Sequence, residues 1–137
     1  MKVAGTEPAS YAFTLNTKAV VAGAIAAYQG VDTDSPVDAA GARKTTSSAS
    51  ITAPSVTTIA PNSVLVGAFG IARDASIAPA GTMTERAEIS TGAATKKVAF
   101  ELSDEIVTAA RPTGERVATA SAAAANIGAV VVLHPAS

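Results

Sequence analysis

The sequence predicts an all-β fold, an antiparallel β-sandwich of jelly-roll-like form, with residues 1–137 as a single domain. Three observations predict it: short segments of alternating apolar and polar residues, Pro- and Gly-containing turns at regular spacing between them, and many small aliphatic side chains. Apolar residues make up 48% of the chain but aromatic residues only 4%, so Ala, Val, Ile and Leu must fill the core. A chain of 137 residues is long enough to bury such a core.

The first two predicted strands lie near the N-terminus. Tyr11, Phe13 and Leu15 alternate with smaller or polar residues, which indicates a half-buried strand. After a short turn, the apolar run Ala19–Tyr28 predicts a central strand with apolar residues on both faces. A helix competes for this Ala-rich run, but its β-branched residues and Gly23 weaken the helical interpretation.

The middle of the chain alternates loops with β-prone segments. Val31–Ala42 contains both Pro and Gly and is predicted to be a loop. Thr45–Thr52 is rich in Ser and Thr and typical of an exposed strand. Pro54 ends that segment, and Ser55–Ile59 follows as a further predicted strand.

The second half supplies five more predicted strands, bounded by turns at residues 60–62 and 79–81 and by a loop at residues 106–114. These strands are Ser63–Ala72, Met83–Ile89, Lys96–Leu102, Arg116–Ala122 and Ile127–His134. Alternation within Met83–Ile89 and Lys96–Leu102 predicts one exposed face for each. Residues 122–125 leave room for one helical turn between the last two strands.

Charge and composition exclude several classes of function. A net charge of −1 provides no basic patch for nucleic acid and no attraction to an anionic membrane. The absence of cysteine excludes disulfides and thiolate metal sites. Residues 1–6 form no apolar h-region, so a classical secretion signal is not expected. No apolar run reaches the roughly 20 residues of a membrane-spanning helix.

Three aspartates on the predicted loop are the candidate metal ligands. Asp32, Asp34 and Asp38 have the spacing D-x-D-x-x-x-D, and carboxylate oxygens gathered on one loop suit Ca²⁺. The EF-hand pattern is absent. In the alternative interpretation these side chains cap turns and accept hydrogen bonds from loop amides.

No set of residues predicts catalysis, and the chain is not expected to be an enzyme. His134 is the only histidine, and no G-x-S-x-G nucleophile elbow occurs. A glycosidase needs two carboxylates that converge across a cleft, whereas Glu85 and Glu101 lie on different predicted strands and are both expected to face solvent. Cross-strand pairing with nearby Lys and Arg side chains explains them more simply.

The aromatic residues offer little surface for stacking on sugar rings. The chain has no Trp, and its three Phe fit core positions on alternating strands. Only Tyr11 or Tyr28 is then left for an exposed platform. This composition weakens a lectin-like interpretation.

Five blocks that follow one another across nearly the whole chain carry a resemblance to a known family. They are Glu7–Leu15, Ala24–Asp38, Thr52–Thr58, Met83–Arg86 and Ala129–Pro135. They resemble a β-sandwich module that recurs in bacteriophage structural proteins of the tail or decoration type and in secreted actinobacterial proteins. The resemblance implies a jelly-roll-like sandwich with a structural or adhesive role. It carries over no catalytic residue, because the matching positions are strand cores and turns.

The chain departs from the family pattern at its start. In the family, further strands of the same sandwich precede the Glu7–Leu15 block, and here residues 1–5 stand in their place. An incomplete sandwich exposes unpaired edges and apolar surface. A neighbouring subunit could complete it by strand addition, the sandwich could be a rearranged minimal one, or the reading frame could start elsewhere.

The sequence therefore predicts a non-enzymatic structural protein of a bacteriophage virion, either a capsid decoration protein or a tail component. Its expected partners are other copies of itself and other virion proteins, held by weak contacts that symmetry repeats. The alternative is an extracellular adhesive or carbohydrate-binding module, with calcium on Asp32, Asp34 and Asp38 assisting glycan binding. A hydrolase ranks third, and no cofactor is expected.

Overall fold

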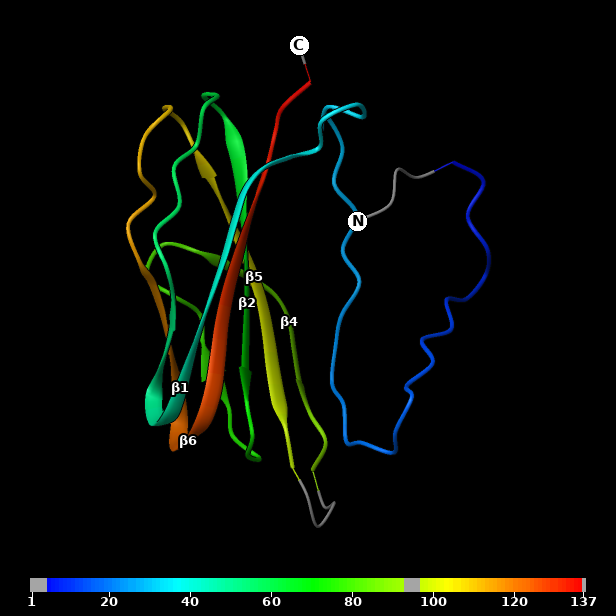
Figure 1. The fold of residues 1–137 in the computed structure, drawn as a ribbon, viewed down its shortest axis with the longest axis vertical. Helices are drawn as coiled ribbons and strands as arrows, with labels where there is room; N and C mark the ends of the chain where they lie inside the picture. Colours follow the sequence, from blue (N-terminus) through cyan, green and yellow to red (C-terminus); the bar gives the residue numbers. More distant parts are fainter. Residues whose placement is uncertain (1–4, 93–96, 137) are drawn as a thin grey trace.

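Six strands form the folded body of this computed structural model, which describes residues 5–92 and 97–136. They are β1 (Val37–Ala53), β2 (Ser63–Ile71), β3 (Ile77–Ala78), β4 (Thr84–Ser90), β5 (Ala99–Val107) and β6 (Arg116–Leu133). All pair antiparallel in one sheet with the order β1-β6-β2-β5-β4, and β3 pairs with β6 beside this path (Figure 1). The all-β prediction is confirmed as one open antiparallel sheet. Within the described ranges, no helix has the length and hydropathy to cross a membrane.

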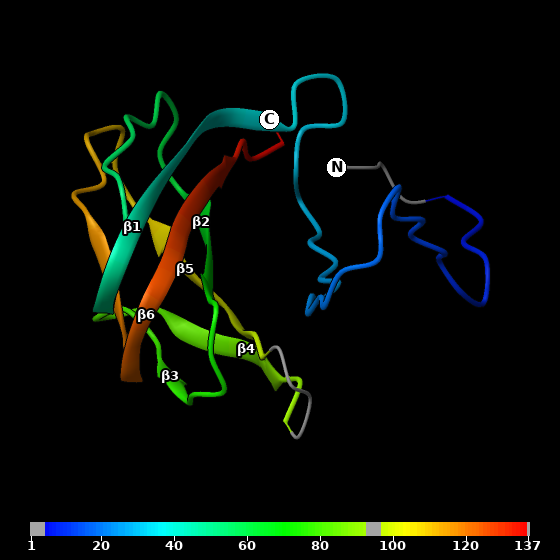
Figure 2. The same cartoon turned by 60° about the horizontal axis from the view of Figure 1, so that its bottom comes forward.

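The two longest strands bend so that the sheet curls over itself. β1 and β6 pair along almost their whole length, but the ladder shifts register twice between Thr45 and Ser50. Such irregularities bend a ladder and increase its twist. Beyond the bend, a Cβ added to Gly128 would lie 2.5 Å from the carbonyl carbon of Thr52. The end of the β1–β6 ladder that contains Thr52 and Ala53 therefore lies directly over the sheet. Both strands turn back near the bottom of Figure 2.

The hydrophobic core lies inside this curl. Along β2 every second side chain is buried, and Leu65 and Phe69 are completely inaccessible. Ile51 of β1, Ala118 of β6 and Ile77 of β3 belong to the same buried cluster. Small aliphatic side chains thus fill most of the core, as the composition predicts, and Phe69 is its largest member.

Several local predictions are confirmed. β2 agrees with the predicted strand Ser63–Ala72, and β1 includes Thr45–Thr52 and ends directly before Pro54. Asn62 lies in the predicted turn with a φ of 60°, a left-handed conformation that Asn tolerates better than most residues. The predicted strand Met83–Ile89 corresponds to β4, most of which is exposed.

Other boundaries differ from the prediction. Arg116–Ala122 and all of Ile127–His134 except its last residue belong to one strand, β6, because the alanines between them continue the ladder through the bend instead of forming a helical turn. Ser55–Ile59 is not a strand and contributes one isolated bridge. β1 begins at Val37, inside the predicted loop Val31–Ala42, because pairing with β6 orders that segment.

The largest difference concerns residues 5–30, which we call the arm. No residue of the arm belongs to a strand, although strands were predicted over Tyr11–Leu15 and Ala19–Tyr28. The arm instead runs as an extended loop outside the sheet, on the side of β4 (Figure 1). β6, β2 and β5 occupy the central positions that Ala19–Tyr28 was expected to share.

Candidate functional site

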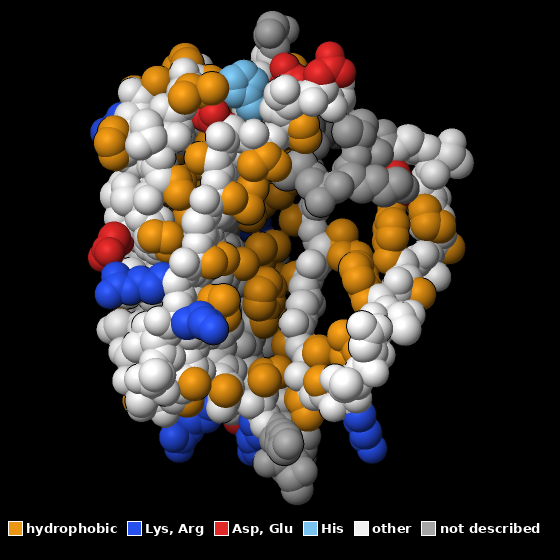
Figure 3. All heavy atoms as spheres, in the orientation of Figure 1, with side chains coloured by type: hydrophobic (Ala, Val, Ile, Leu, Met, Phe, Trp, Pro, Cys, Tyr) orange, Lys and Arg blue, Asp and Glu red, His pale blue; other side chains and the backbone are white. Residues whose placement is uncertain are grey.

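The sheet surface that points away from the core is largely apolar, and we call it the outer face. The ladders of β2 with β5 and β6 bring alternate side chains together on this surface. They are Val64, Val66, Ala68, Phe100, Leu102, Ile106, Ile127, Ala129 and Val131. Figure 3 shows hydrophobic side chains gathered between the sheet and the arm. A sheet with apolar residues on both faces needs a cover on each.

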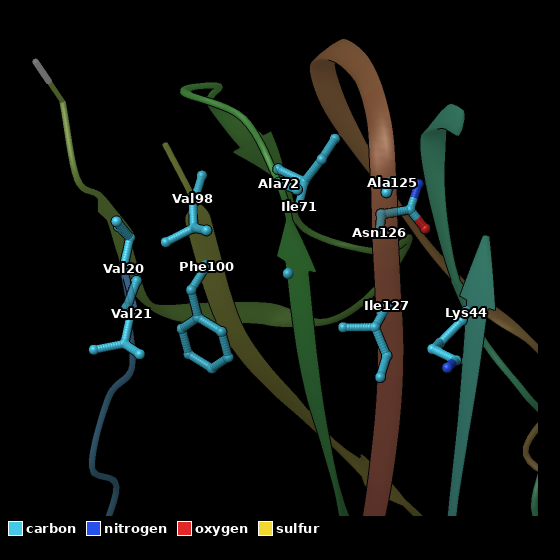
Figure 4. Close-up of a pocket in the computed structure, with 13 residues that line it drawn as sticks. Val20, Val21, Lys44, Ile71, Ala72, Val98, Phe100, Ala125, Asn126 and Ile127 are labelled. Atoms are coloured by element: carbon cyan, nitrogen blue, oxygen red, sulfur yellow. The ribbon is translucent and has the colours of Figure 1, made fainter. Parts of the chain in front are cut away.

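A groove of about 470 Å³ runs between the outer face and the arm. Val20, Val21 and Ala22 of the arm form one side, and residues of β2, β5 and β6 form most of the other. Lys44 and Asn126 are the only polar side chains that line it in the described part of the chain. In Figure 4, Val20 and Val21 lie beside Val98 and Phe100. The groove therefore suits an apolar segment.

A buried carboxylate, paired with a half-exposed arginine, fixes the C-terminal end of the arm to the outer face. Asp104 of β5 is 5% exposed and accepts hydrogen bonds from Arg86 Nε at 2.8 Å and from Arg86 Nη2 at 2.7 Å. The Tyr28 hydroxyl donates a further hydrogen bond to Asp104 Oδ2 at 2.8 Å. We call these three residues the anchor. It connects the arm to β5 and β4, which are far from it in the sequence.

A register shift in β4 explains why Arg86 reaches Asp104. The β4–β5 ladder slips between Glu85 and Ala87, so Arg86 is an extra residue without a partner opposite it. Such bulges redirect a side chain. The guanidinium thereby meets a carboxylate that would otherwise be buried without an opposite charge.

The anchor holds its charges through mutual contacts. Hydrogen bonding to Arg86 is the main cause that lowers the pKa of Asp104, and it outweighs the burial that opposes ionisation. Burial, and then the hydrogen bond to Asp104, raises the pKa of Tyr28. The hydroxyl therefore stays protonated and acts as a donor. This chemistry positions a segment and supplies no nucleophile.

A second buried carboxyl group lies on the core side of β5. Glu101 is completely inaccessible, contrary to the expectation that it faces solvent, because residues of the curled sheet cover that face. Neither of its oxygens has a hydrogen-bond partner in the described structure, since the Ser103 hydroxyl points to Met83 Sδ at 3.7 Å. Burial is the main cause that raises the pKa of Glu101 to about 7; nearby Ser103 opposes this increase, and the charges of Glu85 and Glu88 add to it by smaller amounts.

Among the described residues, the Arg and Lys side chains that were expected to pair with Glu85 and Glu101 have other partners. Arg86 pairs with Asp104, and Lys97 Nζ lies 3.1 Å from Asp74 Oδ2. Lys96, the first residue of a predicted strand, lies outside the described residues.

The three aspartates of the predicted metal loop have different settings, and Asp34 has an exposed side chain. Asp32 Oδ1 accepts hydrogen bonds from the backbone amides of Asp34 and Ser35, both at 2.8 Å, and caps its own turn. These amides lower the pKa of Asp32. Asp38 Oδ2 accepts a hydrogen bond from the Ile59 amide at 2.7 Å, which fits the alternative interpretation. In the part of the chain that is described, no three His, Cys, Asp or Glu side chains are grouped to hold a metal ion.

The aromatic residues and the histidine considered in the sequence analysis lie in different parts of the molecule. Phe69 occupies the core as predicted, but Phe13 is on the surface of the arm. His134 contributes backbone hydrogen bonds to Asp32 and Pro36 near the end of the chain.

Sequence reasoning missed the anchor. One feature of the sequence could have indicated Asp104. It is an acidic residue between the apolar residues Leu102 and Ile106, and a charge that is buried among apolar residues requires a partner. The choice of Arg86 depends on the bulge, which the sequence does not reveal.

Comparisons with protein-family models, curated proteins and solved structures found no match to this chain. The candidate site is therefore defined by the groove, the arm and the anchor of this chain.

Proposed function

We propose that this chain is a non-enzymatic structural protein of a bacteriophage virion, a capsid decoration or tail component that works through symmetric contacts between subunits. The five sequence blocks that resemble phage structural modules support this role. The described surface also supports it, because its most prominent feature is an apolar arm over an apolar groove rather than a set of reactive groups.

The observation that carries the proposal is the exposure of large apolar side chains along the arm. Phe13 is 80% exposed, Leu15 51%, Val21 60% and Ile25 68%. Contiguous apolar surface of this kind marks interaction sites in soluble proteins and favours aggregation when it stays uncovered. Contacts repeated by symmetry would cover it in every subunit of a particle.

The proposal includes a jelly-roll-like sandwich as the finer description of the fold. The returning end of the β1–β6 ladder lies over Gly128 and supplies a second layer above the core. A neighbouring subunit would provide the corresponding cover for the outer face.

Electron microscopy and analytical ultracentrifugation of the purified protein test this role. We expect defined multimers, and regular binding when the protein is mixed with phage capsids or tails. A monomer at every concentration that binds neither particle would contradict the proposal.

One observation favours the alternative, a calcium-assisted glycan-binding module. Asp38 Oδ1 is buried without a hydrogen-bond partner in the described structure and so retains an acceptor for a cation. Glycan-array binding that disappears with a chelator and with Asp38→Asn would support this alternative. Binding to no glycan, with or without calcium, would exclude it.

A further inference from the structure

We propose that residues 72–83, which we call the strap, form a pH-controlled cover of the core. The strap is closed over Glu101 while this carboxyl group is protonated, and it opens as the group loses its proton. The strap joins β2 to β4 and contains β3. Such a device acts within one chain and does not depend on the proposed role in a virion.

The strap covers the face of β5 that carries Glu101. The backbone amide of Ile77 in the strap donates a hydrogen bond to Glu88 Oε1, and Glu88 is directly opposite Glu101 in the β4–β5 ladder. At the end of the strap, Met83 Sδ accepts a hydrogen bond at 3.7 Å from the hydroxyl of Ser103, which shares a face of β5 with Glu101. β3 also lies close to β5. The strap therefore closes over a carboxyl group that is completely inaccessible.

The surroundings of Glu101 suit a neutral acid. Both carboxyl oxygens are buried without a hydrogen-bond partner in the described structure. A carboxylate without partners is strongly disfavoured in such a place, because it loses its water and gains nothing in return. Burial accordingly raises the pKa of Glu101 to about 7. The closed strap and the ionised carboxylate are thus incompatible.

The charged groups of β4 do not stabilise an ionised Glu101. Glu88 is opposite Glu101 and Glu85 is opposite Ser103, and the charges of both glutamates oppose ionisation of Glu101. The nearby cation of β4 is Arg86, but the bulge directs it to Asp104. The β4 strand therefore adds negative charge beside the buried acid.

The other charged groups near the strap are engaged elsewhere. Arg116 of β6 pairs with Glu105 at the end of β5. Within the strap, Arg73 donates to a backbone carbonyl of β6 at 3.3 Å, and Asp74 pairs with Lys97. The buried side chains of β1, β2, β3 and β6 include no ionisable group. An ionised Glu101 therefore depends on water for its stabilisation.

The strap is the element that can let this water in. β5 pairs with β2 along its whole length and with β4 on its other side, so turning Glu101 outward would break two ladders. β3, in contrast, pairs with β6 through only Ile77 and Ala78. Segments held by few backbone hydrogen bonds open at the lowest free energy. Opening of the strap is thus the least costly route by which Glu101 reaches solvent.

Linkage gives the direction of the pH dependence. In the open form Glu101 is hydrated and its pKa returns towards the ordinary 4.5, whereas in the closed form its pKa is about 7. Between these values the closed form binds more protons, so closure is favoured in acid and is lost as the pH rises to 7. The equilibrium constant for opening rises about tenfold per pH unit over this range, roughly 300-fold in total.

Amide hydrogen exchange of the full-length protein, measured by NMR between pH 5 and pH 8, tests the strap. The reporters are the amides of Ile77 and Ser121, since Ser121 donates to the Ser76 carbonyl across the strap at 2.8 Å. Each rate is divided by the intrinsic rate of an unstructured peptide at the same pH. We expect protection of both amides to fall about tenfold per pH unit and to level off above pH 7.

Variants of Glu101 identify the group that titrates. Glu101→Gln has nearly the same shape and cannot ionise, and Glu101→Met replaces the acid with an apolar side chain of similar length if the first variant folds poorly. We expect protection of the strap to be independent of pH in either variant. Glu115→Gln, at an exposed pair with Arg43, is the matched control and should retain the slope of the parent protein.

Two results would overturn the proposal. The first is a parent-like slope that persists in the Glu101 variants, because another group would then control the strap. The second is equal protection of the strap and of the central amides of β2 at every pH, because the opening would then be global unfolding. For a separate strap, we expect its amides to exchange faster than those of β2 by about tenfold or more.

Discussion

At the scale of single residues, the carboxyl groups of Asp104 and Glu101 in β5 show how the surroundings of a group set its pKa. Asp104 has Arg86 and Tyr28 as partners, and its pKa is lowered. Glu101, three positions earlier, has no hydrogen-bond partner in the described structure, and burial raises its pKa to about 7. The two groups therefore affect stability in opposite directions as the pH changes.

Replacing Glu101 with Gln tests the effect of the buried acid. Between its ordinary pKa of 4.5 and about 7 the folded chain binds more protons at Glu101 than the unfolded chain, so its contribution to stability falls as the pH rises through this range. The total loss is about 3 kcal/mol. We expect Glu101→Gln to remove this slope and to be the more stable protein at pH 8, as measured by urea unfolding across pH.

The matched control for this measurement is Glu115→Gln, at an exposed salt bridge with Arg43. Its pH dependence between pH 4.5 and 7 should follow that of the parent protein. If Glu101→Gln also retained the parent slope, the buried acid would not be the group that titrates.

Asp32 provides a second test at this scale. Asp32→Ala removes the acceptor for two backbone amides, so we expect Tm to fall by a few degrees with or without calcium. Asp34→Ala is the control, because Asp34 has no side-chain hydrogen bond among those found in the described residues. Thermal unfolding with calcium and with a chelator distinguishes the roles. A calcium-dependent rise in Tm that both substitutions abolish would instead support metal binding.

At the scale of secondary-structure elements, the bend of β1 and β6 creates the core. It brings Thr52 and Ala53 across Gly128, where a side chain has no space. Gly70 pairs with Ile127, the residue before Gly128. A Cβ added to Gly70 would lie 3.6 Å from its nearest neighbour, which is an ordinary contact. Two glycines on adjacent central strands therefore have different structural roles.

Gly128→Ala and Gly70→Ala form a matched pair. The first places a methyl group against the backbone of the returning strand, and we expect a loss of about 3 kcal/mol or more because that backbone must move. The second should have a much smaller effect. Equal losses in chemical denaturation would show that the returning strand does not pack on Gly128.

At the scale of the whole molecule, the sheet and the arm differ in how they are held. Buried contacts join the strands of the sheet, whereas the anchor is the principal polar link between the arm and β5 in the described structure. Loss of that link should change the arm without unfolding the sheet.

Tyr28→Phe tests this separation. The substitution removes the hydrogen bond to Asp104 but leaves the Arg86 ion pair in place. We expect trypsin to cleave after the exposed Lys18 several times faster, while Tm changes little. Limited proteolysis followed by mass spectrometry measures the rate. An unchanged rate, or a large fall in Tm, would contradict a local role for the anchor.

Much of the sheet could be predicted, whereas the candidate site could not. β2 was readable because strict alternation and flanking turns act locally. The anchor was not, because it joins Tyr28, Arg86 and Asp104 through a bulge and through packing of distant segments. The burial of Glu101 likewise depends on the curl of the sheet rather than on its neighbours in sequence.

The sequence by itself determined the all-β class, the aliphatic core and the stop at Pro54, because period-two patterning, composition and proline geometry are local properties. Only the tertiary structure decided which apolar runs pair with one another. Several segments had the pattern of a central strand, and strand pairing is a contact between distant residues. β2, β5 and β6 filled the central positions, and Ala19–Tyr28 was left outside as part of an arm whose apolar side chains remain exposed.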